Sequence, residues 1–504
     1  MSTGGPWSGR RLHLIGVGGA GMSAYARAAR ALGAQVTGSD RSLSPYAERL
    51  AADGVLNARI GEHAASNVPA GQDVEVVYSS AVGPENPERV AARERGLRER
   101  SRGELLGELT GLRRTIAVAG THGKTTTCAM VVCALRAAGM APDWLIGGTV
   151  GPGEANASWA SEGQGGGEGR WLVVEADESD RSMLMLDVEI AVLTNVELDH
   201  HATFASLGEV REAMREFLGN ARGAVVVWDR SELLELAPGS SSSSSSSVIV
   251  PAADVVAPAS DVVLPAGEVI VPAGADGTAT SEGSVRVELV PYDAIDTQLT
   301  DGGSVTCWRG HEVRLEVPGV HNALNAIAAL EAARLAGAEE GLAVAGLAEF
   351  SGAGRRMQLL GATASGAKIY DDYAHHPTEV AATLAGARTL RAERVVAVFQ
   401  PHLYSRTAMF AREFGAALAL ADAVVVLDVY PARERAEDHP GVSGLLIAQA
   451  AADAAGGKPV YWLPTGADAE PVLRAKLRGG DVCVVMGAGD VDRLAHSLVG
   501  DGSV

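Results

Sequence analysis

The sequence predicts an α/β protein of three domains, in which buried parallel strands alternate with helices. Its 504 residues correspond to about three domains at ~150 residues per domain. Short continuous apolar runs recur along the chain, which is typical of strands covered on both faces by helices. Two strand-like segments, ending at Ile15 and Ala119, lead directly into glycine-rich turns that are followed by helical sequence. We therefore expect open α/β sheets.

The first domain, residues 1–111, is predicted to be Rossmann-like. The strand Leu12–Ile15 precedes Gly16-Val17-Gly18-Gly19-Ala20-Gly21 and a helix rich in Ala and Arg. A second strand ends at Ser39-Asp40, which places an acidic residue about 20 positions after the glycines. Such a βαβ unit holds NAD, another diphosphate or nothing, and the pattern alone leaves all three open. A strand at 74–79 leads to Ser80, and residues 88–110 are expected to be helical.

The second domain, residues 112–350, opens with a loop suited to bind nucleotide phosphate. In Gly120-Thr121-His122-Gly123-Lys124-Thr125-Thr126-Thr127, backbone N–H groups and a helix N-terminus would face the anion. Lys124 adds a point charge, and a threonine hydroxyl can reach Mg²⁺. The chain has only four lysines, and Lys124 is the only one before Lys368. The strict P-loop pattern needs Gly in place of Val118, so this loop is a shortened variant.

Two segments of this domain are expected to carry no chemistry. The glycine-rich residues 161–169 are predicted to form a mobile surface loop. Ser240–Ser247 is a tract of eight serines followed by sequence rich in Pro, Ala and Val. Since such a tract cannot pack, we predict a disordered insertion near residues 238–280.

The third domain, residues 351–504, is predicted to be a second Rossmann-like unit. Its apolar strands alternate with helices rich in Ala and Leu, and the strands are expected at Val395–Phe399, Ala423–Leu427 and Val482–Met486.

Acidic and histidine side chains follow two strands of the central domain. Glu175 ends the strand Trp171–Val174, and a carboxylate at such a strand end beside a phosphate loop suits Mg²⁺. Thr194–His201 follows the next strand, so His200 is a candidate for a second ligand at the same sheet edge. A solvated acidic loop and a surface histidine are the alternatives.

Further polar residues suit contacts to a base or a second substrate. The segment His321-Asn322-Ala323-Leu324-Asn325 opens a helix and suits purine recognition, although helix capping explains it equally well. Arg355 and Arg356 suit charge neutralisation in phosphoryl transfer. The segment Asp371–Pro377 contains an acidic pair, two histidines and a proline suited to start a helix. Arg406 follows a predicted strand and suits contact with an anionic ligand.

Charge and composition exclude several classes of function. The 42 Lys and Arg residues against 62 Asp and Glu residues give a formal charge of −20, which argues against a nucleic-acid or anionic-membrane partner. No run approaches the ~18 apolar residues of a membrane span. The N-terminus has no apolar signal core, so we expect a cytoplasmic protein. Without a nucleophile elbow or a Cys–His protease signature, an enzyme that activates its substrate with ATP is expected.

Taken together, these motifs resemble those of the Mur ligases of peptidoglycan synthesis, over nearly the whole chain except roughly residues 230–310. The segment Asp372-Tyr373-Ala374-His375-His376-Pro377 is most similar to the alanine-adding member. Some members have Arg at the place of Leu403, where it helps to hold the amino acid. Here the resemblance leaves Arg406 to hold the amino-acid carboxylate.

The resemblance implies four sets of ligand contacts. The UDP of UDP-N-acetylmuramate, rather than NAD, would be bound by Gly16, Gly18, Gly19, Ala20, Gly21, Met22, Ser39, Asp40 and Ser80. ATP would be bound by Gly120, Thr121, His122, Gly123, Lys124, Thr125, Thr126, His321, Asn322, Asn325, Arg355 and Asp372. Mg²⁺ would be bound by Thr125, Glu175 and His200, and the amino acid by Tyr373, His375 and Arg406. The catalytic residues would be Lys124, His200, Arg356 and His375.

The activity implied by the resemblance is ATP-dependent joining of L-alanine to the muramoyl carboxylate through an acyl phosphate. The protein would act on small molecules as a monomer or homodimer. A related ligase that joins a muramoyl peptide to the same UDP-sugar is the nearest rival. The alternative of a dehydrogenase is supported only by the first glycine-rich turn and Asp40. The alternative of a non-catalytic ATP-binding protein does not explain the metal ligands.

Overall fold

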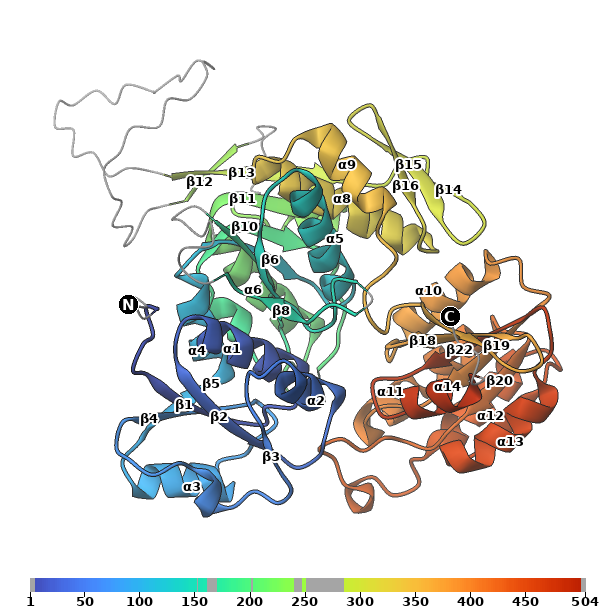
Figure 1. Ribbon diagram of the computed structural model, residues 1–504. Helices are drawn as coiled ribbons and strands as arrows, with labels where there is room; N and C mark the ends of the chain where they lie inside the picture. Colours follow the sequence, from blue (N-terminus) through green and yellow to red (C-terminus); the bar gives the residue numbers. More distant parts are fainter. Residues whose placement is uncertain are drawn as a thin grey trace.

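The chain folds into three sheet-centred parts that follow one another along the sequence (Figure 1). The computed structural model describes residues 5–151, 153–160, 170–200, 203–239, 247–250 and 285–499. In Figure 1 the blue N-terminal part lies below the green central part, and the orange and red C-terminal part lies to the right of both. The predicted α/β fold with three parts is confirmed, whereas the boundaries after residues 111 and 350 stay a prediction.

The N-terminal sheet has five parallel strands in the order β3-β2-β1-β4-β5. Its elements are β1 (Arg11–Ile15), α1 (Ala20–Ala31), β2 (Gln35–Asp40), α2 (Pro45–Ala52), β3 (Arg59–Ile60), η1 (Ala65–Asn67), β4 (Val74–Tyr78), α3 (Pro87–Glu94), β5 (Arg98–Ser101) and α4 (Arg102–Thr110).

One prediction for this part was wrong, because residues 88–110 are not helical throughout. Residues 98–101 form β5, which pairs in parallel with β4 at the edge of the sheet. The sequence Arg-Glu-Arg-Ser has no apolar run that would mark a strand. Arg100 is instead only 7 % exposed and pairs with Glu75 and Glu108, so ion pairs replace apolar burial here.

The central sheet has eight strands in the order β12-β13-β11-β10-β6-β9-β7-β8, parallel except for the pairs β12–β13 and β7–β8. A three-stranded antiparallel sheet, β14-β15-β16, lies beside it. The elements are β6 (Arg114–Ala119), α5 (Lys124–Ala137), β7 (Asp143–Leu145), β8 (Ala157–Ser158), β9 (Trp171–Glu175), η2 (Ser182–Met185), β10 (Val188–Leu193), α6 (Leu207–Gly219), β11 (Ala221–Trp228), α7 (Ser231–Leu234), β12 (Ser247–Val250), β13 (Val285–Tyr292), β14 (Gln298–Leu299), β15 (Ser304–Trp308), β16 (His311–Leu315), α8 (Val320–Leu335) and α9 (Glu340–Ala348).

The two segments expected to be mobile or disordered fall mostly outside the described residues. This holds for 161–169 and for most of 238–280. Ser247–Val250, however, forms β12 and pairs antiparallel with β13, so the prediction of disorder does not hold for these four residues.

The C-terminal sheet has six strands in the order β17-β18-β22-β19-β20-β21, and only the β17–β18 pair is antiparallel. Its elements are β17 (Gln358–Ala362), β18 (Lys368–Asp372), α10 (Pro377–Arg388), β19 (Arg394–Phe399), α11 (Tyr404–Leu418), β20 (Ala423–Val426), η3 (Ala436–Asp438), α12 (Gly444–Ala454), β21 (Val460–Trp462), α13 (Gly466–Lys476), β22 (Asp481–Met486) and α14 (Asp492–Leu498). Among the helices of the described ranges, none combines the length and the apolar character needed to cross a membrane.

The N-terminal and central parts share one apolar core, whereas the C-terminal part has its own. Leu105 and Leu109 of α4 belong to the same buried cluster as Leu172 of β9 and Phe217 of α6. Helix α4 packs closely on η2, since a Cβ on Gly107 would lie 2.5 Å from the carbonyl oxygen of Met185. The two buried clusters of the C-terminal part lie on the two faces of its sheet and contain residues of that part.

A buried carboxylate organises the side of the N-terminal sheet away from this shared core. Glu88 is fully buried and accepts hydrogen bonds from His13 Nε2 at 2.8 Å and His63 Nδ1 at 2.7 Å. Ser39 Oγ and Asn67 Nδ2 donate to the same carboxylate. Burial alone would raise the pKa of Glu88, but these donors lower it to about 2.

We expect Glu88→Gln to destabilise the protein at neutral pH by about 3 kcal/mol, since one pKa unit corresponds to ~1.4 kcal/mol. Because the pKa of Glu88 is lowered on folding, its contribution is full above the unfolded value of 4.5 and is lost as the pH falls toward 2. Urea unfolding gives the difference in unfolding free energy between the wild type and Glu88→Gln, and we expect this difference to be smaller at pH 4 than at pH 7. Glu94→Gln on the exposed face of α3 is the control, and an unchanged difference between the two pH values would contradict the prediction.

Candidate active site

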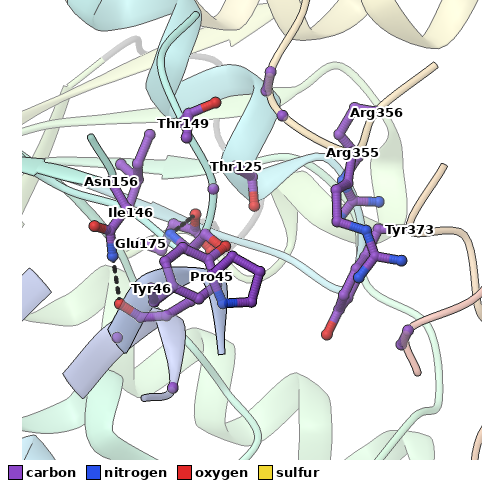
Figure 2. A pocket seen from close by; sticks show the side chains of 18 of the residues that line it. Pro45, Tyr46, Thr125, Ile146, Thr149, Asn156, Glu175, Arg355, Arg356 and Tyr373 are labelled. Carbon is purple, nitrogen blue, oxygen red and sulfur yellow. Dashed lines mark hydrogen bonds between the residues drawn. The ribbon is translucent and has the colours of Figure 1, made fainter. Parts of the chain in front are cut away.

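A cavity of about 1580 Å³ lies where the three parts meet. Figure 2 shows Tyr46 and Glu175 on one side of it and Arg355, Arg356 and Tyr373 on the other. The walls come from the turn after β1, the loop between β6 and α5, the segments after β9 and β10, and the loops of the C-terminal part before β17 and after β18. In parallel sheets such carboxyl-end loops are the usual place for ligands.

The glycine-rich turn after β1 contributes Gly18, Gly19, Ala20 and Gly21 to this cavity. Asp40 fixes the turn, because its Oδ2 accepts the N–H of Gly18 at 2.9 Å. The backbone of Gly16 has a φ of +81°, a value that favours glycine.

Two residues predicted to bind UDP lie behind this turn. Met22 is 2 % exposed and Ser39 is 1 % exposed, and the Ser39 hydroxyl donates to Glu88. In this structure their side chains support the turn from inside the domain. Ser80 is exposed beyond the end of β4, and its contact with UDP stays a prediction.

The loop between β6 and α5 has the geometry of a phosphate-binding loop. Gly120 has a φ of +131° and Gly123 a φ of +84°, which turn the chain from β6 into the N-terminus of α5. Lys124 Nζ lies 2.6 Å from the carbonyl oxygen of Gly120 and 2.8 Å from Glu178 Oε2. Burial alone would lower the pKa of Lys124, but the Glu178 carboxylate reverses this and raises it. The lysine is therefore held as a cation over the loop.

Carboxylates and a histidine converge beside this lysine. Glu175 Oε1 accepts the N–H of Gly147 at 2.6 Å, and the Thr125 hydroxyl also faces this carboxylate. Burial raises the pKa of Glu175, so a cation placed there would offset an unfavourable buried charge. The side chains of Asp177, Glu178 and His200 lie close enough for their ligand atoms to fall within 4.8 Å of one another.

This donor set fits a divalent cation of the Mg²⁺ type, which prefers oxygen ligands. Among the described residues, Glu178 Oε1 is buried without a hydrogen-bond partner, and His200 Nε2 lies 3.5 Å from it. Glu175 and His200 were predicted from the sequence as metal ligands. Asp177 and Glu178 follow Glu175 directly and lie at the same sheet edge, but the sequence favoured Glu175 over these neighbours.

A second, smaller cavity of about 270 Å³ lies behind the phosphate loop, between the central and C-terminal parts. The predicted residues His321, Asn322, Asn325 and Asp372 all line it, together with apolar side chains that include Leu324, Val317 and Phe350. Burial lowers the pKa of His321 to about 4, so its ring is neutral. An apolar pocket with amide groups at its wall suits a purine base.

The C-terminal part places two arginines and an aromatic pair over the large cavity. Arg355 Nε lies 3.0 Å from Asp371 Oδ2, and Arg356 Nη1 lies 3.4 Å from Glu379 Oε1. The rings of Tyr373 and His375 meet edge to face, with centroids 5.3 Å apart. Burial lowers the pKa of His375 to about 4, so its imidazole is neutral near pH 7.

The structure assigns Arg406 a partner that the sequence did not predict. Arg406 is 4 % exposed, and its Nη2 lies 2.7 and 3.0 Å from the two carboxylate oxygens of Asp199. This guanidinium therefore joins α11 to the segment after β10, and in this arrangement it is not available to hold an amino-acid carboxylate. The predicted role of Arg406 would require it to leave Asp199.

Comparison with known proteins accounts for all three parts of the chain. Residues 11–114 match the model described as Mur ligase family, catalytic domain, and residues 118–250 match the Mur ligase middle domain. Residues 355–489 match the Mur ligase glutamate ligase domain. The chain belongs to the Mur ligase family.

Relatives of this Mur ligase match it over almost its whole length. A protein of Kineococcus radiotolerans named UDP-N-acetylmuramate–L-alanine ligase is 43 % identical, over 97 % of this chain and 95 % of that protein. A protein of the same name from Rhodococcus erythropolis is 40 % identical, over 97 % and 96 %. As a Mur ligase, the protein is an ATP-dependent ligase.

Solved structures of Mur ligases share the fold. The UDP-N-acetylmuramate-alanine ligase of Thermotoga maritima has a TM-score of 0.73 at 24 % identity and covers 97 % of this chain and 98 % of its own. The murein peptide ligase of Psychrobacter arcticus has a TM-score of 0.65 at 23 % identity, with the same coverage. At these identities the likeness establishes the fold alone.

Proposed function

We propose that this Mur ligase joins L-alanine to the carboxylate of UDP-N-acetylmuramate, with cleavage of ATP to ADP and phosphate. The observation that carries the proposal is 38–43 % identity, over at least 97 % of the chain, to relatives named for this reaction. The large cavity supports it, since a glycine-rich turn, a phosphate loop and a pair of arginines face one space.

The reaction would proceed in two steps. A muramoyl carboxylate oxygen attacks the γ-phosphorus of ATP, the bond to the bridging oxygen breaks, and ADP leaves with the electron pair. The alanine nitrogen then attacks the carbonyl carbon of the acyl phosphate, and phosphate leaves and takes up the amine proton. Both steps bring anionic groups together, so catalysis depends on positioning and on neutralisation of charge.

We assign Lys124 and the loop amides to the ATP phosphates, and Arg355 and Arg356 to the charge that develops on the transferred phosphoryl group. Thr125, Glu175 and His200 would hold Mg²⁺, with Asp177 and Glu178 beside them. Bound Mg²⁺ would supply charge neutralisation between the phosphates and the attacking carboxylate.

His375 is suited to orient the amine. Its Nδ1 lies 3.0 Å from the carbonyl oxygen of Tyr373, which places the ring proton on that nitrogen. Nε2 then carries a free lone pair that can accept a hydrogen bond from the incoming amine. The turn after β1 would hold the UDP diphosphate through its backbone amides.

Phosphate release from ATP and Mg²⁺ tests this function. UDP-N-acetylmuramate is supplied with L-alanine, glycine, L-serine or a muramoyl-type peptide in turn, and each pair is repeated without Mg²⁺. We expect release that requires the UDP-sugar, L-alanine and Mg²⁺ together. If the peptide were the one acceptor that supports release together with the UDP-sugar, the protein would instead be the peptide-joining ligase. Nucleotide binding with no release under any pairing would indicate a non-catalytic ATP-binding protein.

A further inference from the structure

Glu379 at the N-terminus of α10 lies on the boundary between the two cavities and lines both of them. Its side chain is 9 % exposed. The two carboxylate oxygens have different partners. Oε2 accepts the backbone N–H groups of His375 at 3.0 Å and His376 at 3.3 Å, which caps α10. Oε1 faces His122 Nδ1 at 3.3 Å and Arg356 Nη1 at 3.4 Å.

His122 brings the phosphate loop into this contact from the central part of the protein. Its backbone N–H donates to Asn195 Oδ1 at 2.9 Å, so the residue is fixed where the loop turns. Its Nε2 lies 3.3 Å from Glu197 Oε2, and the same carboxylate oxygen accepts the Thr378 hydroxyl at 2.7 Å. Burial alone would lower the pKa of His122, but Glu197 and Glu379 raise it to about 9. The imidazolium ion of His122 thus lies between Glu197 of the central part and Glu379 of the C-terminal part.

Two simpler explanations account for less of this arrangement. A helix cap alone uses only Oε2 and leaves the contacts of Oε1 unexplained. A metal site formed by His122, Glu197 and His376 has the right residue types, but both nitrogens of His122 face carboxylates. In addition, His376 Nδ1 accepts the N–H of Thr378 at 3.4 Å. Both ring nitrogens of His122 and Nδ1 of His376 are therefore taken up by these contacts, while His376 Nε2 is buried without a hydrogen-bond partner among the described residues.

We propose that Glu379 is a positioning residue, which sets Arg356 over the phosphate loop by holding His122 with the same carboxylate oxygen. The proposal rests on the function proposed above, since Arg356 acts there on the transferred phosphoryl group. One oxygen fixes the start of α10, and the other fixes the distance between α10 and the loop. Because the two large apolar clusters of the C-terminal part are its own, polar contacts of this kind contribute to how that part sits on the phosphate loop.

The difference between the two oxygens makes Glu379→Gln a selective test. The amide oxygen of glutamine can still accept the N–H groups of His375 and His376, so the cap is kept. The amide NH₂ would then face His122 and Arg356 and cannot accept from either. We expect kcat to fall about 10- to 100-fold, as for a small misplacement of a catalytic group, with the Kd for ATP changed less than threefold.

A double-mutant cycle with His122→Gln measures whether the two side chains act through each other. If they do, the double variant has about the same kcat as the worse single variant. Asp468→Asn is the matched control, because Asp468 caps α13 in the same way in the same part of the protein and is exposed. We expect its kcat to be unchanged. Multiplicative losses in the double variant, or wild-type kcat in Glu379→Gln, would overturn the proposal.

Hydrogen–deuterium exchange provides a readout that needs no turnover. Peptides covering residues 119–127 should exchange faster in Glu379→Gln than in the wild type, while peptides of α10 stay unchanged. Unchanged exchange of the loop would show that Glu379 only caps its helix. If the wild type itself released no phosphate with L-alanine, the proposed function would fail, but this comparison would still decide whether Glu379 holds the loop.

Discussion

Replacing Lys124 by alanine should lower turnover by at least ~100-fold, a loss of roughly 2.7 kcal/mol in transition-state stabilisation. The ammonium group is held beside the loop amides by Glu178 and the carbonyl oxygen of Gly120, where it would contact the ATP phosphates. Its removal would also leave Glu178, whose side chain is 2 % exposed, as a buried carboxylate without its cation.

The measurement is kcat for phosphate release, with the folded state checked by circular dichroism. Lys368→Ala removes the same charge from an exposed position at the start of β18 and serves as the control. Near-normal turnover in a folded Lys124→Ala variant would overturn the assignment of this loop to ATP.

A single methyl group at Gly120 should abolish nucleotide binding at micromolar ATP. The φ of +131° is rare for any residue with a Cβ, and a Cβ there would overlap the Thr194 hydroxyl and lie 2.9 Å from the carbonyl oxygen of Asn195. That carbonyl is backbone and cannot turn aside. We expect Gly120→Ala to weaken ATP binding about 30- to 1000-fold, because strain and overpacking of this kind cost about 2–4 kcal/mol together.

Gly139→Ala is the matched control, since Gly139 lies just beyond the other end of α5. It also has a positive φ, +76°, but a Cβ there would meet no atom within 4 Å. This variant should lose about 1 kcal/mol of stability and keep its affinity for ATP. Isothermal titration of ATP into both variants separates loss of the loop geometry from a general loss of stability. Equal affinities in the two would contradict the prediction.

The fold and the loops of the site could be predicted because they depend on local patterns. The strands before Gly120 and Glu175 are continuous apolar runs, and the strand before Gly16 is apolar except for Arg11 and His13. Parallel strands bring their carboxyl ends to one edge of a sheet. The start of α10 at Pro377 is likewise readable from one turn of sequence. The strand β5 could not be predicted, because its stabilisation comes from ion pairs between distant residues.

The partners of charged side chains could not be predicted, because they depend on how the three parts meet. Arg406 and Asp199 are 207 positions apart, and nothing near either residue indicates the other. Glu379 follows the recognisable His-Pro segment, yet its contact with His122 exists only because α10 lies over the phosphate loop. Glu178 was within reach of prediction, but the irregular chain after β9 hides which of its carboxylates turn inward.

The shared core of the N-terminal and central parts has a consequence for how the protein loses its structure. Leu105 and Leu109 cannot be exposed to water without opening the cluster that also holds Leu172 and Phe217. Two domains that bury a common set of side chains unfold cooperatively, as one unit. The C-terminal part, with its separate clusters, forms a second unit. We therefore expect melting to divide the chain near the boundary between the central and C-terminal parts, so that the protein unfolds as two cooperative units although it has three sheet domains.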